Sequence, residues 1–267
     1  MEAIVRLLTT ADVPAVVELA RAAGWNQTNA DIERLLELEP EGCFGVEEDG
    51  RVVATATLLT YGSALAWVGM VLTHGEYQRR GYATRLLERT LRIADEWGIS
   101  TVKLDATDEG ARVYSRFGFR DEQPVERWAT NRWCPAAFVA EPARVSLDLD
   151  RSAFGSDRAR LLSLFGEPKA VSGAHAYTRE GSCASYLGPF VAARHSSAEH
   201  LIETYFSVAV TRPQPWFWDL LPANTYAVEL ARNCGFALQR RLMRMVRGKN
   251  LRSEEQLIYG IAGFELG

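Results

Sequence analysis

The chain has 267 residues, of which 47% are hydrophobic and 24% charged, so it can bury the core of one large domain or of two ordinary ones. A formal net charge of −4 argues against a protein that coats nucleic acid or an anionic membrane, although a local basic site is compatible with it. The N-terminal stretch MEAIVRLLTTADV has no long apolar run, so we expect neither a signal peptide nor a membrane span, and the cytoplasm is the default compartment.

Periodicity in the first half predicts two short helices followed by an alternation of strands and helices. Thr10 is expected to cap the first helix, and Thr28 with Asp31 forms a capping box for the second. The predicted elements are helices over 11–22 and from 29, a hairpin over 43–60 turning at 48–50, a buried central strand over 64–73, a helix over 83–97, a strand over 101–107, a helix over 110–117 and a final strand. This order is an α/β unit complete by about residue 145.

The second half repeats that order in outline. Asn224 is expected to cap its last predicted helix, which Gly235 ends. The predicted elements are a helix over 157–165, strands over 169–178 and 182–192, a helix from a Ser196–Glu199 capping box to about 210, a strand over 215–221 and the helix after 224.

Two short matches support a duplicated fold. The segment VGMVLT at 68–73 aligns with LGPFVA at 187–192, and ARVYSRFGF at 111–119 aligns with VELARNCGF at 228–236. The offsets, 119 residues (68 to 187) and 117 residues (111 to 228), are nearly equal. We therefore predict two domains, 1–143 and 144–267, joined without a flexible linker around 141–151 and packed directly together.

The loop HGEYQRRGYAT at 74–84 is the stretch most typical of a binding site. Gly81 permits positive φ and close approach of a ligand to the backbone, while Arg79 and Arg80 add positive charge. A helix begins directly after the loop, and the first turn of a helix offers unpaired N–H groups and the positive end of the helix dipole. Together these features favour a phosphate-bearing ligand.

With the strand MVLT before it, the segment Gln78-Arg79-Arg80-Gly81-Tyr82-Ala83 resembles the Q/R-x-x-G-x-G/A coenzyme A signature of the GNAT N-acetyltransferases. About thirty residues later, 111–119 resembles the second motif of that family, a helix that carries a tyrosine and ends in Gly-Phe. The segments GWNQT, AWVGMVL and LDAT resemble a bacterial subgroup that carries a second GNAT-like domain. The resemblance implies an α/β fold (α+β by some schemes) of tandem GNAT-like domains, each a mixed twisted sheet flanked by helices.

The resemblance also implies roles for individual residues. The co-substrate would be acetyl-CoA, its pyrophosphate bound by the loop and its pantetheine arm lying along the preceding strand. The implied cofactor-binding residues are Val71, Leu72 and Thr73 on the strand and Gln78, Arg79, Arg80, Gly81, Tyr82, Ala83 and Thr84 in the loop and helix start. Tyr114 would protonate the departing thiolate, with a tyrosine packed under its helix as the structural alternative. Trp25 and Asn26 would line the acceptor pocket, although Trp25 also fits a core or rim position.

No residue is identified as the base that deprotonates the acceptor amine. Asp105 lies on the predicted strand out of phase with its apolar neighbours, so it could bind or deprotonate an ammonium. It could equally cap the next helix or pair with an arginine. Glu76 and His74 fit solvated loop positions, and a water chain to a distant carboxylate is also allowed.

The second half lacks the features that would bind the cofactor. In the alignment its strand-to-helix interval is four residues shorter (73 to 83 against 192 to 198), and ARHSS replaces the arginine-glycine loop. Ala231 stands where the first half has Tyr114. We therefore expect the second domain to be a degenerate copy that packs, dimerises or shapes the acceptor site.

Together these observations predict an N-acetyltransferase that transfers acetyl from acetyl-CoA to a primary amine of a small molecule or peptide by direct attack in a ternary complex. The alternative is a non-catalytic acyl-CoA sensor whose second domain binds a partner. We expect no nucleic-acid or membrane partner. Scattered cysteines and histidines without ligand spacing predict reduced thiols and no metal. The acceptor, the acyl length and the oligomeric state, a homodimer included, are not fixed by the sequence.

Overall fold

The computed structural model describes residues 3–135, 144–208 and 214–267. The strands are β1 (Ile4–Leu7), β2 (Cys43–Glu48), β3 (Arg51–Tyr61), β4 (Leu65–Thr73), β5 (Thr101–Ala106), β6 (Arg120–Pro135), β7 (Lys169–Val171), β8 (Ala174–Arg179), β9 (Ser185–Ala192), β10 (Phe206–Val208), β11 (Gln214–Leu220), β12 (Ala237–Gly248) and β13 (Ile258–Gly260). The helices are α1 (Val13–Ala22), α2 (Asn29–Leu38), α3 (Tyr82–Glu96), α4 (Asp108–Tyr114), α5 (Leu147–Phe154), α6 (Ala159–Ser163), α7 (His195–Tyr205) and α8 (Thr225–Asn233). Short 3₁₀ turns are η1 (Thr10–Asp12), η2 (Pro40–Gly42), η3 (Gly75–Tyr77), η4 (Ser115–Phe117) and η5 (Glu255–Leu257).

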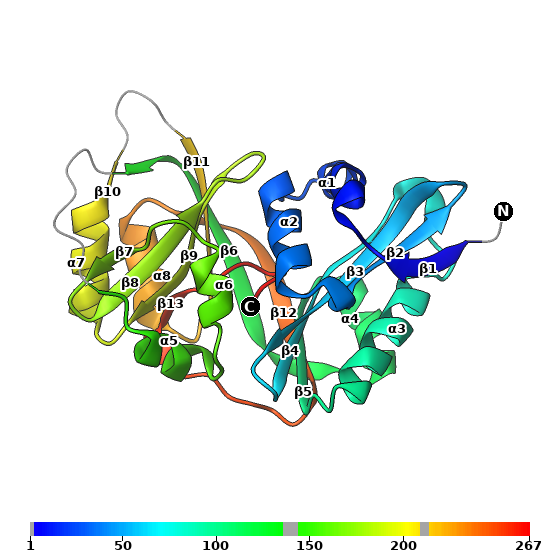
Figure 1. Ribbon diagram of the computed structural model, residues 1–267. Coiled ribbons are helices and arrows are strands. Elements are labelled where there is room, and N and C mark those ends of the chain that lie inside the picture. Colours follow the sequence, from blue (N-terminus) through cyan, green and yellow to red (C-terminus); the bar gives the residue numbers. More distant parts are fainter. Residues whose placement is uncertain (1–2, 136–143, 209–213) are drawn as a thin grey trace.

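These strands form one mixed sheet that runs through both halves of the molecule (Figure 1). Its order is β1-β2-β3-β4-β5-β12-β6-β11-β9-β8-β7, with β10 on β6 and β13 on β9. Figure 1 shows the two halves as lobes side by side, with the C-terminus between them. The expected α/β fold, a mixed sheet flanked by helices, and the direct packing of the halves are confirmed.

Helices cover both faces of the first-half sheet because its central strands are apolar on both sides. Leu59 and Trp67 share a core with residues of α1 and α2, whereas Leu58 and Val68 share one with residues of α3. Neighbouring residues of a strand point to opposite faces, so α1 and α2 lie on one face and α3 on the other. The α1–α2 core also takes in Phe154 of α5 and Leu161 and Leu162 of α6, which joins the two halves.

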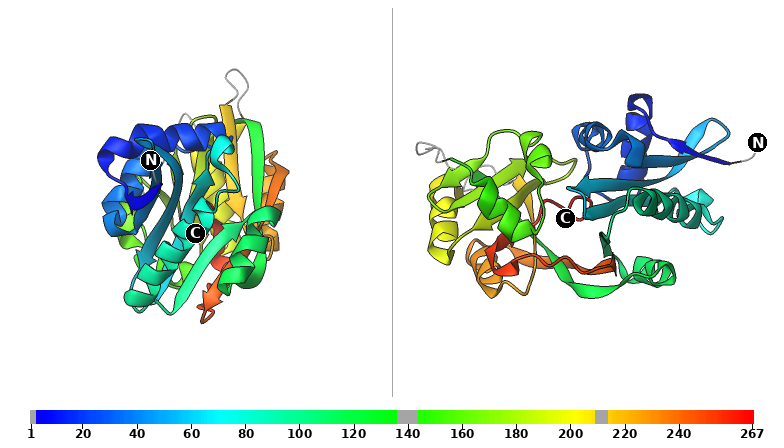
Figure 2. Two further views of the ribbon diagram at one scale, coloured as in Figure 1. Left: turned by 90° about the vertical axis from the view of Figure 1, so that its right-hand side faces the viewer. Right: turned by 60° about the horizontal axis from the view of Figure 1, so that its bottom comes forward.

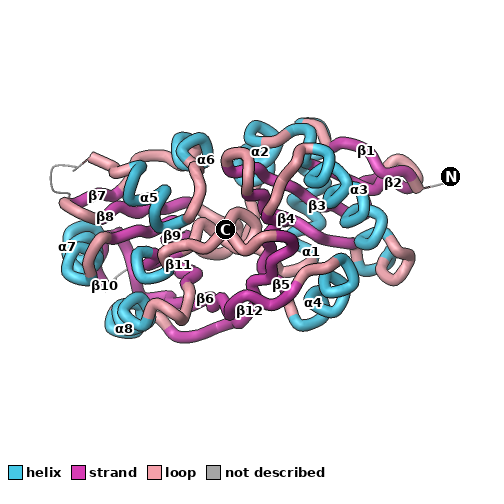
Figure 3. The backbone as a smooth tube through the Cα atoms, turned by 90° about the horizontal axis from the view of Figure 1, so that it is seen from below, coloured by secondary structure: helices cyan, strands magenta, loops and turns pink. Residues whose placement is uncertain are grey.

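The sheet continues between the halves through an exchanged strand, which the sequence did not predict. β12 follows the last predicted helix of the second half and pairs antiparallel with β5 over Met243–Gly248. Its other edge pairs antiparallel with β6. Figure 3 shows β12 and β6 side by side where the two lobes meet, next to β5. A strand from the second half therefore completes the sheet of the first.

The hairpin β2–β3, the central strand β4 and the Thr28 capping box match the prediction, since Thr28 Oγ1 accepts from the Asp31 N–H at 3.3 Å. Asn224 caps α8 as predicted, accepting from the Ala227 N–H at 3.1 Å. Other boundaries differ. The helical region starts one residue earlier than predicted, with the 3₁₀ turn η1 ahead of α1. Thr9, not Thr10, is the N-cap of this turn, and its N–H donates to the Asp12 carboxylate.

In the second half, the predicted strand over 169–178 is a hairpin, because the chain turns at Gly173 with φ 79°. The Ser196 capping box is wrong: Ser196 lies inside the first turn of α7, whose N-cap is Arg194 without a side-chain bond. The predicted helix over 157–165 shortens to α6, and α5 before it was not predicted. The helix predicted to reach about 210 ends at Tyr205, because 206–208 form β10 on the edge of β6; only 209–210 of it lie outside the described residues. Of the predicted junction over 141–151, 141–143 lie outside the described residues and 147–151 belong to α5.

Candidate functional site

A cavity of about 470 Å³ opens where two parallel strands of the first half separate. β4 and β5 pair only over Leu65–Trp67 and Thr101–Lys103, near the start of each strand. Beyond these residues both strands continue, and Val68 to Val71 of β4 and Leu104 of β5 line the cavity. Strand edges that do not pair with each other leave backbone polar groups available to a ligand.

A β-bulge bends β4 at the cavity. Between the pairs Thr55–Leu72 and Thr57–Gly69 the register shifts, so β4 has one residue more than β3. Met70 in the bulge has φ 49°, and its carbonyl accepts from Thr55 Oγ1 at 2.8 Å. The bulge bends β4 away from β5 over residues 70–73, which helps to open the cleft between these two strands.

The other end of the cavity is the loop at 74–81. Arg79 with φ 61° and Gly81 with φ 81° both adopt the left-handed conformation, and Gly81 is the N-cap of α3. A Cβ built on Gly81 meets nothing within 4 Å, so its Cα faces open space. As a glycine, Gly81 has no side chain to cap the first-turn N–H groups of α3, which remain available to a ligand.

The structure brings most of the predicted cofactor-binding residues to this cavity. Those that line it are Val71, Thr73, Gln78, Arg79, Gly81, Tyr82, Ala83 and Thr84. Leu72 does not, because its side chain packs in the α1–α2 core. Arg80 also lies outside the lining: its guanidinium contacts Glu48 at 3.3 Å and stacks over Tyr77 at 4.8 Å. Tyr82 is largely buried, and its hydroxyl donates to Glu48 at 2.8 Å.

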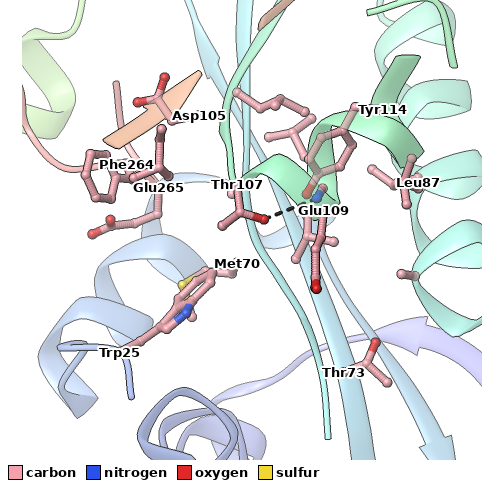
Figure 4. Close-up of a pocket in the computed structure, with 18 of the residues that line it drawn as sticks. Trp25, Met70, Thr73, Leu87, Asp105, Thr107, Glu109, Tyr114, Phe264 and Glu265 are labelled. Atoms are coloured by element: carbon pink, nitrogen blue, oxygen red, sulfur yellow. Dashed lines mark hydrogen bonds between the residues drawn. The ribbon is translucent and has the colours of Figure 1, made fainter. Parts of the chain in front are cut away.

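Tyr114 lines the same cavity from α4 (Figure 4). Thr107 caps this helix by accepting from the Gly110 N–H at 3.1 Å. Gly110 lies under the tyrosine ring, since a Cβ there would come within 2.9 Å of its Cε2 atom. Phe119 supports the ring at a centroid distance of 6.0 Å. Burial raises the pKa of Tyr114 to about 12, so the phenol holds its proton at neutral pH.

Asp105 lies at the cavity wall, but Arg244 of β12 holds its carboxylate. The guanidinium donates from Nε and Nη2 at 2.8 and 3.0 Å, and the Asp105 side chain is fully covered. Burial raises the pKa of Asp105, and the Arg244 charge opposes that rise. Of the alternatives left open by the sequence, pairing with an arginine is the one seen, and Thr107 rather than Asp105 caps α4.

Trp25 and Asn26 lie in the connection between α1 and α2, and both border the cavity. Trp25 is partly buried at the α1–α2 core and reaches the cavity in Figure 4. The Asn26 side chain instead bonds to the second half: its amide donates to the Ala184 carbonyl at 2.7 Å, and its oxygen accepts from the Cys183 N–H at 2.7 Å. These bonds occupy the Asn26 amide and link the two halves beside the cavity.

β6 and the second half supply the remaining wall of the cavity, which the sequence analysis missed. The lining residues from beyond residue 120 are Arg127, Tyr186, Arg240, Leu242, Phe264 and Glu265. Asp219 accepts from Nε and Nη2 of Arg127 at 2.7 and 2.6 Å. The Arg127 guanidinium also stacks on the Phe264 ring at 4.5 Å. The wall is therefore built from arginine, aromatic and carboxylate groups of four different segments.

The segment 261–267 carries Glu265 to this wall (Figure 4). The Phe264 and Leu266 carbonyls accept from Trp67 Nε1 at 3.0 Å and from the Tyr61 hydroxyl at 2.7 Å, which fixes the segment against β3 and β4. Glu265 is 4% exposed, and its Oε1 accepts from Arg179 at 3.1 Å. Burial raises the pKa of Glu265, against the effect of Arg179. No local sequence pattern marks this residue, since its place depends on contacts with distant strands.

The corresponding strands of the second half separate in the same way, but protein fills the gap. β9 and β11 pair in parallel over Ser185–Leu187 and Trp216–Trp218. Beyond them β13 pairs with β9, and the Ile261 N–H donates to the Asp219 carbonyl at 2.8 Å. The chain passes from β9 to α7 through residues 193–194 alone, against 74–81 in the first half. Ala231, the counterpart of Tyr114, is fully buried in α8.

Among the described residues, no cluster of three or more His, Cys, Asp or Glu side chains could hold a metal ion. None of the described helices has the length and apolar character needed to span a membrane. Cys43, Cys183 and Cys234 are free thiols, and the side chain of Cys134 lies outside the described part.

Comparison with known proteins places both halves in one class, the acetyltransferases. Residues 10–119 match the model of the Acetyltransferase (GNAT) family, and residues 146–260 match that of an Acetyltransferase (GNAT) domain. The chain thus belongs to the GNAT acetyltransferase family and carries two of its domains.

Individual relatives agree with this assignment. The uncharacterized N-acetyltransferase YitH of Bacillus subtilis is 28% identical over 160 residues, a match that spans 56% of this chain and about half (55%) of that relative. A putative acetyltransferase from Pyrococcus horikoshii superposes with a TM-score of 0.83 at 23% identity, covering 99% of this chain and 96% of that one. A GCN5-related N-acetyltransferase from Sphaerobacter thermophilus superposes at 0.62 with 17% identity, covering 98% of each chain. The last two show the shared fold.

Proposed function

We propose that this protein is an N-acetyltransferase that transfers acetyl from acetyl-CoA to a primary amine by direct attack in a ternary complex. The observation that carries the proposal is the continuous cavity that joins the loop at 74–81, the bulged edge of β4 and the Tyr114 ring. A long, thin co-substrate with a phosphate group at one end and a thioester at the other fits such a cavity. In this assignment the acceptor enters from the side of Trp25 and Glu265.

The loop is suited to the pyrophosphate of acetyl-CoA. Backbone N–H groups of Arg79 to Thr84 would donate to it, with the α3 dipole and the Arg79 charge adding to the attraction. The open space over Gly81 is what such close approach requires, because a side chain there would occupy it. Val71 and Thr73 would line the pantetheine arm along β4, and Gln78, whose amide approaches the Thr73 carbonyl at 3.5 Å, would close its edge.

Tyr114 is the proposed general acid. The amine nitrogen bonds to the thioester carbonyl carbon as the carbon–sulfur bond breaks, and the sulfur takes its proton from the Tyr114 hydroxyl. The raised pKa keeps that proton in place at neutral pH until the sulfur becomes basic. A backbone N–H at the β4 bulge would polarise the carbonyl oxygen.

Glu265 is the proposed base, the role that the sequence left unassigned. Its carboxylate lies at the acceptor wall, and its raised pKa brings it nearer to that of a working general base. Asp105, whose two oxygens bond to Arg244, would position β5 and β12 rather than accept the proton.

The second domain is proposed to be a degenerate copy that shapes the acceptor site. Its own cleft is occupied by β13, while its residues complete the cavity of the first domain. We retain the division into 1–143 and 144–267 as the proposed domain boundary, with β12 crossing it to pair with β5.

Release of free thiol from acetyl-CoA across a panel of amines tests this function, with calorimetry to follow binding of acetyl-CoA. The proposal expects saturable binding and amine-dependent thiol release. Binding without turnover on any amine would replace it with the acyl-CoA sensor.

A pH profile tests the base. Because a base must be deprotonated, kcat/KM should rise with pH through the raised pKa of Glu265 and then level. Glu265→Gln should lower kcat by roughly a hundredfold and remove that rise. Deprotonation of the acceptor amine can add a second rise to the pH profile. Measuring two acceptors whose amines differ in pKa separates the two rises, because only the one due to the amine shifts with the acceptor. Glu109→Gln, an exposed cavity residue on α4, is the matched control. A variant Glu265→Gln that keeps the rate and the rise would remove Glu265 from this role.

A further inference from the structure

We call the side of the cavity lined by Asp105, Arg127, Tyr186, Arg240, Leu242, Phe264 and Glu265 the acceptor wall. Partners within the protein neutralise nearly all of its charges. Asp105 pairs with Arg244, Arg127 with Asp219, and Glu265 with Arg179. Each of these pairs joins two buried or nearly buried groups at short distance. They therefore leave the wall without a net charge of their own.

Arg240 is the exception. It lines the cavity from β12, and no ion pair or hydrogen bond joins it to any other described residue. Its register partner across the sheet is Arg127, a like charge whose Nε and Nη2 already bond to Asp219. Burial and the Arg127 charge lower the pKa of Arg240, and the Asp219 charge opposes them. The Arg240 side chain is exposed at the cavity, so its charge is open to a ligand as well as to water.

An uncompensated guanidinium in a cavity favours an anionic ligand group. The position of Arg240 separates this group from the proposed cofactor phosphates. Arg240 lies on β12, which pairs with β6 and is separated from β4 by β5 in the sheet, whereas the proposed phosphate loop follows β4 and leads into α3. The anion that Arg240 would bind therefore belongs to the acceptor.

The rest of the wall is compatible with a small organic acceptor. Trp25, Tyr186 and Phe264 present aromatic surface to the same cavity. Glu265, the proposed base, faces it from the segment 261–267. Among the described residues, this side of the cavity thus combines an arginine without an ion pair, the Glu265 carboxylate and aromatic surface.

We infer that the acceptor is an amino carboxylic acid, whose carboxylate binds Arg240 while its amine reaches the thioester and its carbon skeleton packs on the aromatic wall. This inference rests on the proposed function and assigns the class of its unidentified substrate.

Matched pairs of acceptors test the inference: L-phenylalanine against phenethylamine, L-leucine against isoamylamine, and L-lysine against cadaverine. For at least one pair the carboxylated member should have a kcat/KM higher by about tenfold or more, the effect of one charge-assisted hydrogen-bonded pair. Arg240→Gln should remove this preference through KM and leave the rate with the decarboxylated amine within about twofold, and Arg240→Lys should retain part of it.

Arg241→Gln is the matched control, because the neighbouring arginine bonds to Glu126 at 2.9 Å and does not line the cavity. Equal or better turnover of every decarboxylated amine, or a preference that survives in Arg240→Gln, would overturn the inference and leave the acetyltransferase intact. Thiol release with other amines but with none of these amino acids would also overturn the inference, whereas absence of thiol release with every amine of the wider panel would overturn the proposed function itself.

Discussion

In the first half of the sheet, β4 and β5 pair near their starts and then diverge around a cavity. In the second half, β9 and β11 pair over the same number of residues and then diverge around β13, a strand from the same chain. Figure 2 shows both halves of the sheet and the chain end between them. The same strand geometry can therefore hold either a ligand or a piece of protein. The occupant is decided by the connection that follows the first strand and by the residues that face the gap.

The connection accounts for the largest difference. Eight residues, 74–81, lead from β4 to α3 and end in the left-handed Gly81, whereas only 193–194 separate β9 from α7. A two-residue connection has no room for a bend that turns several N–H groups toward one point. In the second half the divergent edges bond instead to β13 and the residue after it, which satisfies their polar groups without a ligand.

Replacing Gly81 should make the first half behave like the second and have the largest effect. In Gly81→Val the side chain fills the approach to the backbone and strains φ, so affinity for acetyl-CoA should fall by roughly a thousandfold, the loss of two or more charge-assisted bonds. Calorimetric titration measures this. Gly98→Val, also with positive φ and open space but at the far end of α3, controls for strain. Equal affinities of the two variants would place the phosphates elsewhere.

Removing the Tyr114 hydroxyl sharpens the comparison with Ala231. Tyr114→Phe should lower kcat by about a hundredfold and leave the Kd for acetyl-CoA within about twofold, because the hydroxyl acts on the departing sulfur. Assays of thiol release measure kcat, and calorimetry measures the Kd for acetyl-CoA. Tyr226→Phe, an exposed tyrosine of α8, is the control. Normal turnover in Tyr114→Phe would remove the acid role.

Disturbing β13 should have the smallest effect and touch only stability. A Cβ on Gly260 would come within 3.0 Å of Trp218 Nε1 and 3.3 Å of Phe190 Cβ, so Gly260→Ala should lower the free energy of unfolding by about 1–3 kcal/mol. Acetyl-CoA should still bind with one molecule per chain. Denaturant unfolding provides the measurement, and Gly166→Ala, which meets no atom within 4 Å, is the control. A second binding event in Gly260→Ala would show that β13 covers a working cleft.

Local patterns were sufficient for much of the first half. The hairpin at 48–50, the apolar strand β4 and the bend at Gly81 follow from turn residues, alternation and glycine, and each is found in the structure. The family motifs led to Tyr114 and the phosphate loop, which the structure brings to one cavity. Their chemical roles stay proposals.

Long-range pairing was not predicted. β12 contains four arginines among its twelve residues, and its place between β5 and β6 depends on partners more than a hundred residues away, such as Asp105 for Arg244. Glu265 and Arg240 reach the site only through that pairing and through the packing of 261–267 on β4. No local pattern in the sequence encodes either position, since both are set by tertiary contacts.

The most direct test is a crystal structure of the protein soaked with CoA. We predict density for the pyrophosphate at the N–H groups of 79–84 and for the pantetheine arm between β4 and β5, with the sulfur beside Tyr114 and the gap between β9 and β11 still occupied by β13. Density for the nucleotide at the start of α7, with the cavity beside Gly81 empty, would contradict the account.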